Sequence, residues 1–195
     1  MAKLHFKYGA MNCGKTDTLI KTAYNYMEQG LNVVVIKPSV DIKGGPNLLT
    51  RSGVSREVDI LATPTMDIAK KLREIHKNKK LNCVLIDETQ FLTPKQIDQL
   101  FDIAKNESIS VIAHGLRADF RTELFPGSKR LFEIADNIEK LPTMCSCGSQ
   151  AEFNCRQVDG KYVFKGNQVA IDGEGEVTYL PLCGVCYELA KIGKI

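Results

Sequence analysis

The sequence has no tryptophan, only three histidines and no apolar run near the roughly 20 residues that span a bilayer. The missing apolar run argues against a membrane protein. A hydrophobic share of 44% and a charged share of 25% argue against fibrous and disordered classes. Its 195 residues suit one domain with a small appendage. We therefore expect a soluble globular protein.

A strong excess of one charge sign is also lacking. Lys plus Arg number 26 and Asp plus Glu number 23, which leaves a formal net charge of +3. A field this weak does not draw the whole molecule to nucleic acid or anionic lipid, although a local basic patch stays open. We expect neither a membrane partner nor a stable nucleic-acid partner.

Residues 1–7 contain no uninterrupted apolar stretch of the kind found in a secretory leader, so a cytoplasmic chain is expected. Thiols stay reduced in that compartment. The seven cysteines are therefore the informative number, because clustered cysteines in a reducing compartment indicate metal ligation or catalysis more than disulfides.

Strand patterns and helix patterns alternate along the first part of the chain. Strands are predicted at 4–8, 31–36, 83–86, 110–116 and 138–141, and helices at 14–29, 66–75, 94–104 and 128–137. This alternation predicts an α/β fold with a mostly parallel sheet and flanking helices. Residues 39–64 show little periodicity and are expected to form a long loop with short strand-like pieces. After Pro142 short β patterns, glycines and cysteines prevail, so we predict an α/β domain at 1–141 and a small β-rich lobe at 142–195.

A phosphate-binding motif follows the first predicted strand. The predicted ATP-binding residues are Gly9, Ala10, Met11, Asn12, Cys13, Gly14, Lys15 and Thr16, which fit G-x-x-x-x-G-K-[ST] in full. Backbone N–H groups and a helix N-terminus would face a phosphate, Lys15 would reach the β- and γ-phosphates, and Thr16 would ligate Mg²⁺. The alternative is an ordinary glycine turn before a helix. The position between strand and helix favours a P-loop (RecA-like) nucleotide-binding domain.

Two adjacent acids follow the apolar strand predicted at 83–86. Asp87 would stand at the carboxyl edge of the sheet, where ligands bind in open α/β folds, and would hold hydrated Mg²⁺ opposite Thr16. Glu88 could take a proton from an attacking hydroxyl or water. The predicted ATP-binding set also includes Asp87, Glu88, Thr89 and Gln90. An acid pair in a solvated turn is the alternative, which the P-loop disfavours.

Two close cysteine pairs lie in the C-terminal part of the chain, Cys145 with Cys147 and Cys183 with Cys186. Such pairs on turns rich in Ser and Gly can supply four thiolates to a tetrahedral Zn²⁺, and a small lobe gains stability from a metal. Four protein ligands leave no position for a catalytic water, so a structural zinc is predicted. The single residue inside the first pair is fewer than usual, and unbound reduced thiols are the alternative.

Together these features resemble the zinc-containing cytosolic thymidine kinase family, over nearly the whole chain and in order. The resemblance rests on the P-loop at 9–16, Asp-Glu-Thr-Gln-Phe at 87–91, Gly-Leu-Arg-Ala-Asp-Phe at 115–120, and the cysteine pairs that flank Tyr179. It implies an ATP:thymidine 5′-phosphotransferase that makes dTMP and ADP for nucleotide salvage and DNA synthesis. It also implies a cytoplasmic homotetramer that dTTP inhibits.

The resemblance assigns roles residue by residue. Glu88 would be the base that accepts the 5′-hydroxyl proton, with Gln90 beside the nucleotide. The implied substrate-binding residues are Met11, Leu116, Phe120, Phe125 and Tyr179. Phe120 and Phe125 would flank the thymine ring, and the loop before Tyr179, held by zinc, would enclose the base. Without the family argument, the two phenylalanines are equally well interpreted as core anchors.

Some positions depart from the family pattern. Lys43 stands where the family usually has arginine in Asp-x-Arg, which puts a bidentate contact in question. The acidic segment 173–178 is longer than usual, and Asn154 replaces a threonine found near the thymine methyl in several relatives. Both changes leave selectivity between thymidine and deoxyuridine analogues open. Arg117 and Arg121 are candidates for steadying transferred charge, with solvated surface positions as the alternative.

Two other hypotheses remain at this stage. One is a P-loop ATPase module whose zinc lobe binds DNA, which the weak net charge and the absence of a basic stripe disfavour. The other is a nucleotide-gated structural protein that binds ATP without turnover. The three histidines, His5, His76 and His114, have no partner at suggestive spacing and are expected to be structural.

Overall fold

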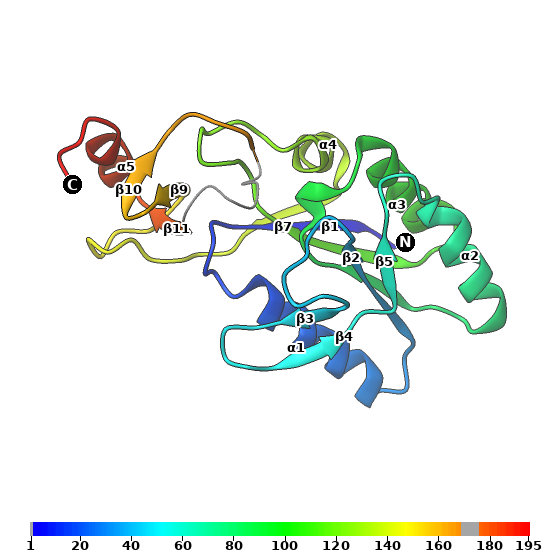
Figure 1. Ribbon diagram of the computed structural model, residues 1–195. Helices are drawn as coiled ribbons and strands as arrows, with labels where there is room; N and C mark the ends of the chain where they lie inside the picture. The colour runs from blue at the N-terminus through cyan, green and yellow to red at the C-terminus, as the bar shows by residue number, and fades with distance from the viewer. Residues whose placement is uncertain (1, 169–175) are drawn as a thin grey trace.

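The computed structural model of the chain describes residues 2–168 and 176–195. Its centre is a six-stranded sheet in the order β5-β2-β6-β7-β1-β8 (Figure 1). The strands are β1 Leu4–Tyr8, β2 Val33–Pro38, β5 Ile60–Ala62, β6 Cys83–Ile86, β7 Ser110–Gly115 and β8 Asn137–Lys140. Every pairing in this sheet is parallel, which confirms the predicted α/β fold.

Helices cover both faces of the sheet (Figure 1). They are α1 Lys15–Glu28, α2 Ile68–Asn78, α3 Pro94–Asn106 and α4 Pro126–Ile134. The fully buried strand β6 shows why its sequence is an unbroken apolar run: Cys83 and Leu85 pack toward α1, while Val84 and Ile86 pack toward the other three helices. None of the described helices combines the length and the apolar character that crossing a membrane requires.

Local sequence signals set the ends of two helices. The predicted capping box at the start of α3 is present, since Thr93 accepts from the Gln96 backbone N–H and the Gln96 side chain accepts from the Thr93 N–H. Helix α4 begins at Pro126, earlier than predicted, and stops before Ala135, which is extended. The predicted continuation to residue 137 is wrong because the Asp136 carboxylate accepts a hydrogen bond from the Leu4 N–H and draws the chain into β8.

Residues 39–64 contain three short strands. Strands β3 Asn47–Leu49 and β4 Ser55–Glu57 form an antiparallel hairpin, and β5 joins the edge of the central sheet. The preceding loop folds around the buried Lys37 ammonium, which pairs with Asp41 at 3.1 Å and donates to the carbonyl oxygens of Lys43, Gly45 and Asn47. Because polar contacts with one ammonium order this loop, its sequence shows no hydrophobic periodicity.

The C-terminal part has its own sheet, in the order β10-β9-β11, and its own core. The elements are β9 Phe153–Val158, β10 Lys161–Val163, β11 Val177–Leu182 and helix α5 Gly184–Lys191. Helix α5 was not predicted. It begins directly after Cys183, whose sulfur accepts from the Cys186 N–H.

Candidate active site

The chain turns sharply into the phosphate-binding motif where β1 ends. A Cβ on Gly9 would lie 2.5 Å from the Cys13 sulfur and 2.8 Å from the Leu141 carbonyl oxygen, so only glycine fits there. Gly14 has a φ of 74°, which glycine adopts readily, and the following Lys15 begins α1. The loop therefore curls onto a helix N-terminus, where N–H groups and the helix dipole favour an anion.

Two side chains of the motif occupy defined positions. The buried Lys15 ammonium donates to the Ala10 carbonyl oxygen at 3.1 Å, and the Thr16 hydroxyl donates to the Asp87 carboxylate at 2.7 Å. Burial, and then the charge of Glu88, raises the pKa of Asp87 to about 7. A buried carboxylate beside a hydroxyl is an oxygen donor set that suits Mg²⁺, which usually keeps several of its waters.

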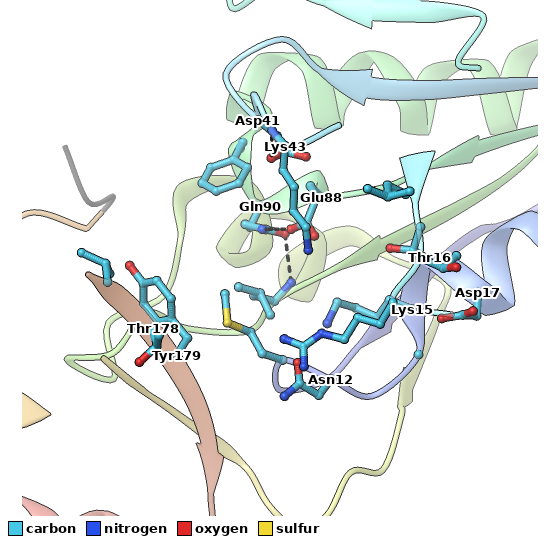
Figure 2. Close-up of a pocket in the computed structure, with 18 residues that line it drawn as sticks. Asn12, Lys15, Thr16, Asp17, Asp41, Lys43, Glu88, Gln90, Thr178 and Tyr179 are labelled. Carbon is cyan, nitrogen blue, oxygen red and sulfur yellow. Dashed lines mark hydrogen bonds between the residues drawn. The ribbon is translucent and has the colours of Figure 1, made fainter. Parts of the chain in front are cut away.

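The backbone aims Glu88 toward the space in front of the phosphate loop. Glu88 has a φ of 49°, a strained left-handed conformation for this residue type, and such strain is frequent at functional sites. The Gln90 amide donates to the Glu88 carboxylate, and its oxygen accepts from the Leu116 N–H at 3.0 Å (Figure 2). A Cβ on Gly115 would lie 2.6 Å from the Thr89 hydroxyl, so this close approach requires glycine.

A cavity of about 650 Å³ lies between the phosphate loop, the hairpin region, the acid pair and β11 (Figure 2). The predicted site residues in its lining are Met11, Asn12, Gly14, Lys15, Thr16, Glu88, Gln90, Leu116 and Tyr179. Gly9, Ala10, Cys13, Asp87 and Thr89 are not in the lining. The lining is polar at the start of α1 and apolar at Met11 and Leu116. The cavity is large enough for a nucleotide-sized ligand.

Phe120 and Phe125 are only 1% and 5% exposed and are not among the cavity's lining residues. Phe125 meets the ring of Phe91 edge-on, with centroids 5.7 Å apart, and Phe91 lines the cavity. The sequence did not identify Phe91 as a site residue, although Phe91 is the last residue of the acidic motif at 87–91. Contact of Phe120 and Phe125 with a thymine ring stays a prediction, and their burial agrees with the alternative of core anchors.

The positive charges of the cavity come from other residues than the two arginines named in the sequence. Arg121 pairs with Asp119 at 2.8 Å, and neither Arg121 nor Arg117 lines the cavity. Lys43 and Arg51 do line it, together with Lys15. Arg51 was missed because it lies in the β3–β4 turn, which carries no recognisable motif.

Asn154 in β9 contacts the phosphate loop. Its side-chain oxygen accepts from the Met11 N–H at 2.8 Å, and its amide donates to the Ala118 carbonyl oxygen at 3.1 Å. Both ends of this buried amide are therefore engaged within the protein.

The structure brings the two cysteine pairs together. The four sulfurs of Cys145, Cys147, Cys183 and Cys186 all lie within 4.8 Å of one another. Sulfurs around a tetrahedral Zn²⁺ would be about 3.8 Å apart, given Zn–S bonds of ~2.3 Å. Hydrogen bonding with Cys147, then with Cys145 and Cys183, raises the pKa of Cys186 to about 12. Four thiolates this close repel one another unless a cation lies between them. A tight turn, in which the Cys145 N–H donates to Ser149, accommodates the short first spacing.

A phosphate loop and a carboxylate on one cavity define, as a class, a P-loop protein that binds a nucleoside triphosphate. The chain belongs to the thymidine kinase family, since the family model described as "Thymidine kinase" matches residues 2–187. It is 40% identical over 197 residues to a thymidine kinase of Haemophilus influenzae, covering 100% of both chains. It is 40% identical over 185 residues to that of Enterobacteria phage T4, with 94% of each chain covered. The thymidine kinase of Pasteurella multocida is 39% identical over 190 residues, with 96% of this chain and 97% of that one covered.

Proposed function

We propose that the chain transfers the γ-phosphate of ATP to the 5′-hydroxyl of thymidine, giving dTMP and ADP. Besides membership of the family, one observation carries this proposal: Glu88 faces the same cavity as Lys15 and Thr16, with Leu116 and Tyr179 in the same lining. A cavity that combines a proton-accepting carboxylate, a phosphate loop and an apolar surface suits a reaction in which the hydroxyl of a nucleoside attacks the γ-phosphate of a nucleotide.

The P-loop would bind the phosphates of the nucleotide. Its N–H groups and Lys15 would hold the β- and γ-phosphates, and Thr16 with Asp87 would hold Mg²⁺. The bound ion would neutralise charge that develops on the transferred group. Lys43 and Arg51, which also line the cavity, add positive charge.

Glu88 and the apolar lining would bind and activate the nucleoside that accepts the phosphate. The Glu88 carboxylate would accept the 5′-hydroxyl proton while Gln90 holds its orientation. Met11, Leu116 and Tyr179 would contact the nucleoside. Because the transition state of phosphoryl transfer is loose, alignment and charge stabilisation account for most of the catalysis.

We further propose that the four cysteines hold a structural Zn²⁺ and that residues 142–195 form a separate lobe beside the α/β domain of 1–141. The lobe supplies Tyr179 from β11. A zinc site that joins the residues directly after β11 to the turn before β9 would steady the nucleoside side of the cavity. Of the acidic segment 173–178, residues 173–175 lie outside the described part of the chain.

We also propose that the chain forms a cytoplasmic homotetramer and that dTTP inhibits it. One dTTP molecule carries both a thymine and a triphosphate, so it could occupy both ends of the cavity. Sedimentation would measure the assembly state. Inhibition by dTTP at varied ATP and thymidine would test competition at both ends.

The decisive assay incubates the protein and ATP with thymidine or with DNA and measures ADP and dTMP. We expect thymidine to stimulate ADP release with an equal yield of dTMP. Stimulation by DNA without dTMP would support the ATPase hypothesis, and ATP binding without turnover would support the structural protein. Comparing thymidine, deoxyuridine and deoxycytidine then defines selectivity.

A further inference from the structure

A buried arginine lies behind Tyr179. Arg156 is in β9 and only 2% exposed, and it is the largest of the fully buried side chains. Within residues 2–168 and 176–195, no carboxylate forms an ion pair with it. Burying a guanidinium costs free energy unless hydrogen bonds and packing compensate, so its contacts indicate what it does.

Three structural segments meet at this one guanidinium. Arg156 Nε donates to the Tyr179 hydroxyl at 2.9 Å, and Nη2 donates to the Gln168 carbonyl oxygen at 3.2 Å. Its Cζ lies 3.8 Å from the centroid of the Phe120 ring. The pairing of β9 with β11 places Arg156 directly opposite Tyr179.

These contacts need the shape of arginine in particular. A planar guanidinium can donate in two directions in its plane while its face stacks on an aromatic ring, whereas the ammonium of lysine has no such plane. Tyr179 lines the cavity but Arg156 does not, so the arginine acts on any cavity ligand through the tyrosine. The Tyr179 hydroxyl is fixed, and with it the orientation of the ring.

We propose that Arg156 is a positioning residue that sets the affinity for the nucleoside by fixing Tyr179 against Phe120 and the Gln168 backbone. This inference rests on the proposed function, because it takes the Tyr179 side of the cavity to be the nucleoside side. Arg156 acts on thymidine binding and leaves the phosphate end of the cavity untouched.

The test compares Arg156→Met, Arg156→Lys and Tyr179→Phe with the parent protein. We expect Arg156→Met to raise both the KM and the calorimetric Kd for thymidine roughly tenfold or more, the effect of losing a hydrogen bond from a charged donor. The KM for ATP should stay within about twofold, and Arg156→Lys should recover only part of the loss. Arg130→Met, which removes a surface arginine of α4, is the matched control and should change neither constant.

A double-mutant cycle separates positioning from general loss of structure. If Arg156 acts through Tyr179, adding Tyr179→Phe to Arg156→Met should raise the thymidine Kd by no more than about twofold beyond Arg156→Met alone. Additive effects, or equal losses for thymidine and ATP, would overturn the proposal. Should Arg156→Met fail to fold, Arg156→Lys and Tyr179→Phe still probe the same hydrogen bond. Because thymidine Kd is measured without ATP, this result is distinct from a failure of the parent to make dTMP.

Discussion

The Thr16 hydroxyl donates a 2.7 Å hydrogen bond to the Asp87 carboxylate, which joins the phosphate loop to the acid pair. The two residues follow β1 and β6, and β7 lies between these strands in the sheet. Their contact therefore depends on the strand order of the folded protein. It places a hydroxyl and a carboxylate side by side.

Replacing Thr16 tests whether this pair holds Mg²⁺. We expect Thr16→Val to lower kcat/KM for Mg-ATP by about ten- to a hundredfold, the usual cost of disturbing a metal's ligand environment. Thr16→Ser keeps the hydroxyl and serves as the matched control. The measurement is activity against Mg²⁺ concentration at fixed ATP. An unchanged Mg²⁺ dependence in Thr16→Val would exclude Thr16 as a ligand.

Glu88→Gln tests the assigned base. The variant keeps the shape of the side chain but loses the proton acceptor, so kcat should fall by about 10²–10⁴ while ATP binding is retained. Glu133→Gln, at an exposed position on α4, is the control and should leave both unchanged. Initial rates of dTMP formation and equilibrium ATP binding measure the two effects. A Glu88→Gln enzyme that works at the parent rate would show that another group accepts the proton.

Elements with strong local signals were predictable from the sequence. The apolar run of β6 and the capping box of α3 each depend on residues that are close together in the sequence, and both are present. Strand β5 and the loop around Lys37 were not predicted as such. The three residues of β5 are ordered by parallel pairing with β2, and the loop is ordered by contacts of its backbone carbonyl groups with one ammonium, so neither leaves a periodic pattern in the sequence.

In the site, too, residues of local motifs were predictable, and residues brought together only by the fold were not. Lys15 and Glu88 belong to motifs whose spacing is fixed by the chemistry, so the sequence alone named them. Phe91, Arg51 and Arg156 were not named. The contact of Arg156 with Tyr179 arises from pairing between β9 and β11, and no spacing in the sequence shows which residues face each other across strands.

The four-cysteine cluster predicts a metal content that can be counted. Purified protein should contain about one zinc per chain, and replacing both Cys183 and Cys186 by serine should remove it, since two of four ligands are lost. Cys155→Ala is the control, because Cys155 is buried in the same lobe outside the cluster. Elemental analysis measures the metal, and thymidine KM should rise in the double variant. Full zinc occupancy after the double replacement would reject the site.

His114 lies fully buried in β7, and neither ring nitrogen has a hydrogen-bond partner among the described residues. Burial, followed by the charges of Lys7 and Lys15, lowers the pKa of His114 from 6.5 to about 3. The native state therefore stays unprotonated where the unfolded chain takes up a proton. The stability contributed by the neutral ring is complete above pH 6.5 and is lost as the pH falls toward about 3.

His114→Leu removes this titration and an unpartnered polar ring at similar volume. Its free energy of unfolding should fall less steeply with acid than that of the parent, and the difference between the two should grow by up to about 1.4 kcal/mol per pH unit below the ordinary histidine pKa. Urea unfolding across that range, without ligands, measures both curves, and the carboxylates common to both proteins cancel in the difference. Parallel curves would mean that the buried ring accepts a proton in the native state, and that the space around His114 admits water or a counter-charge.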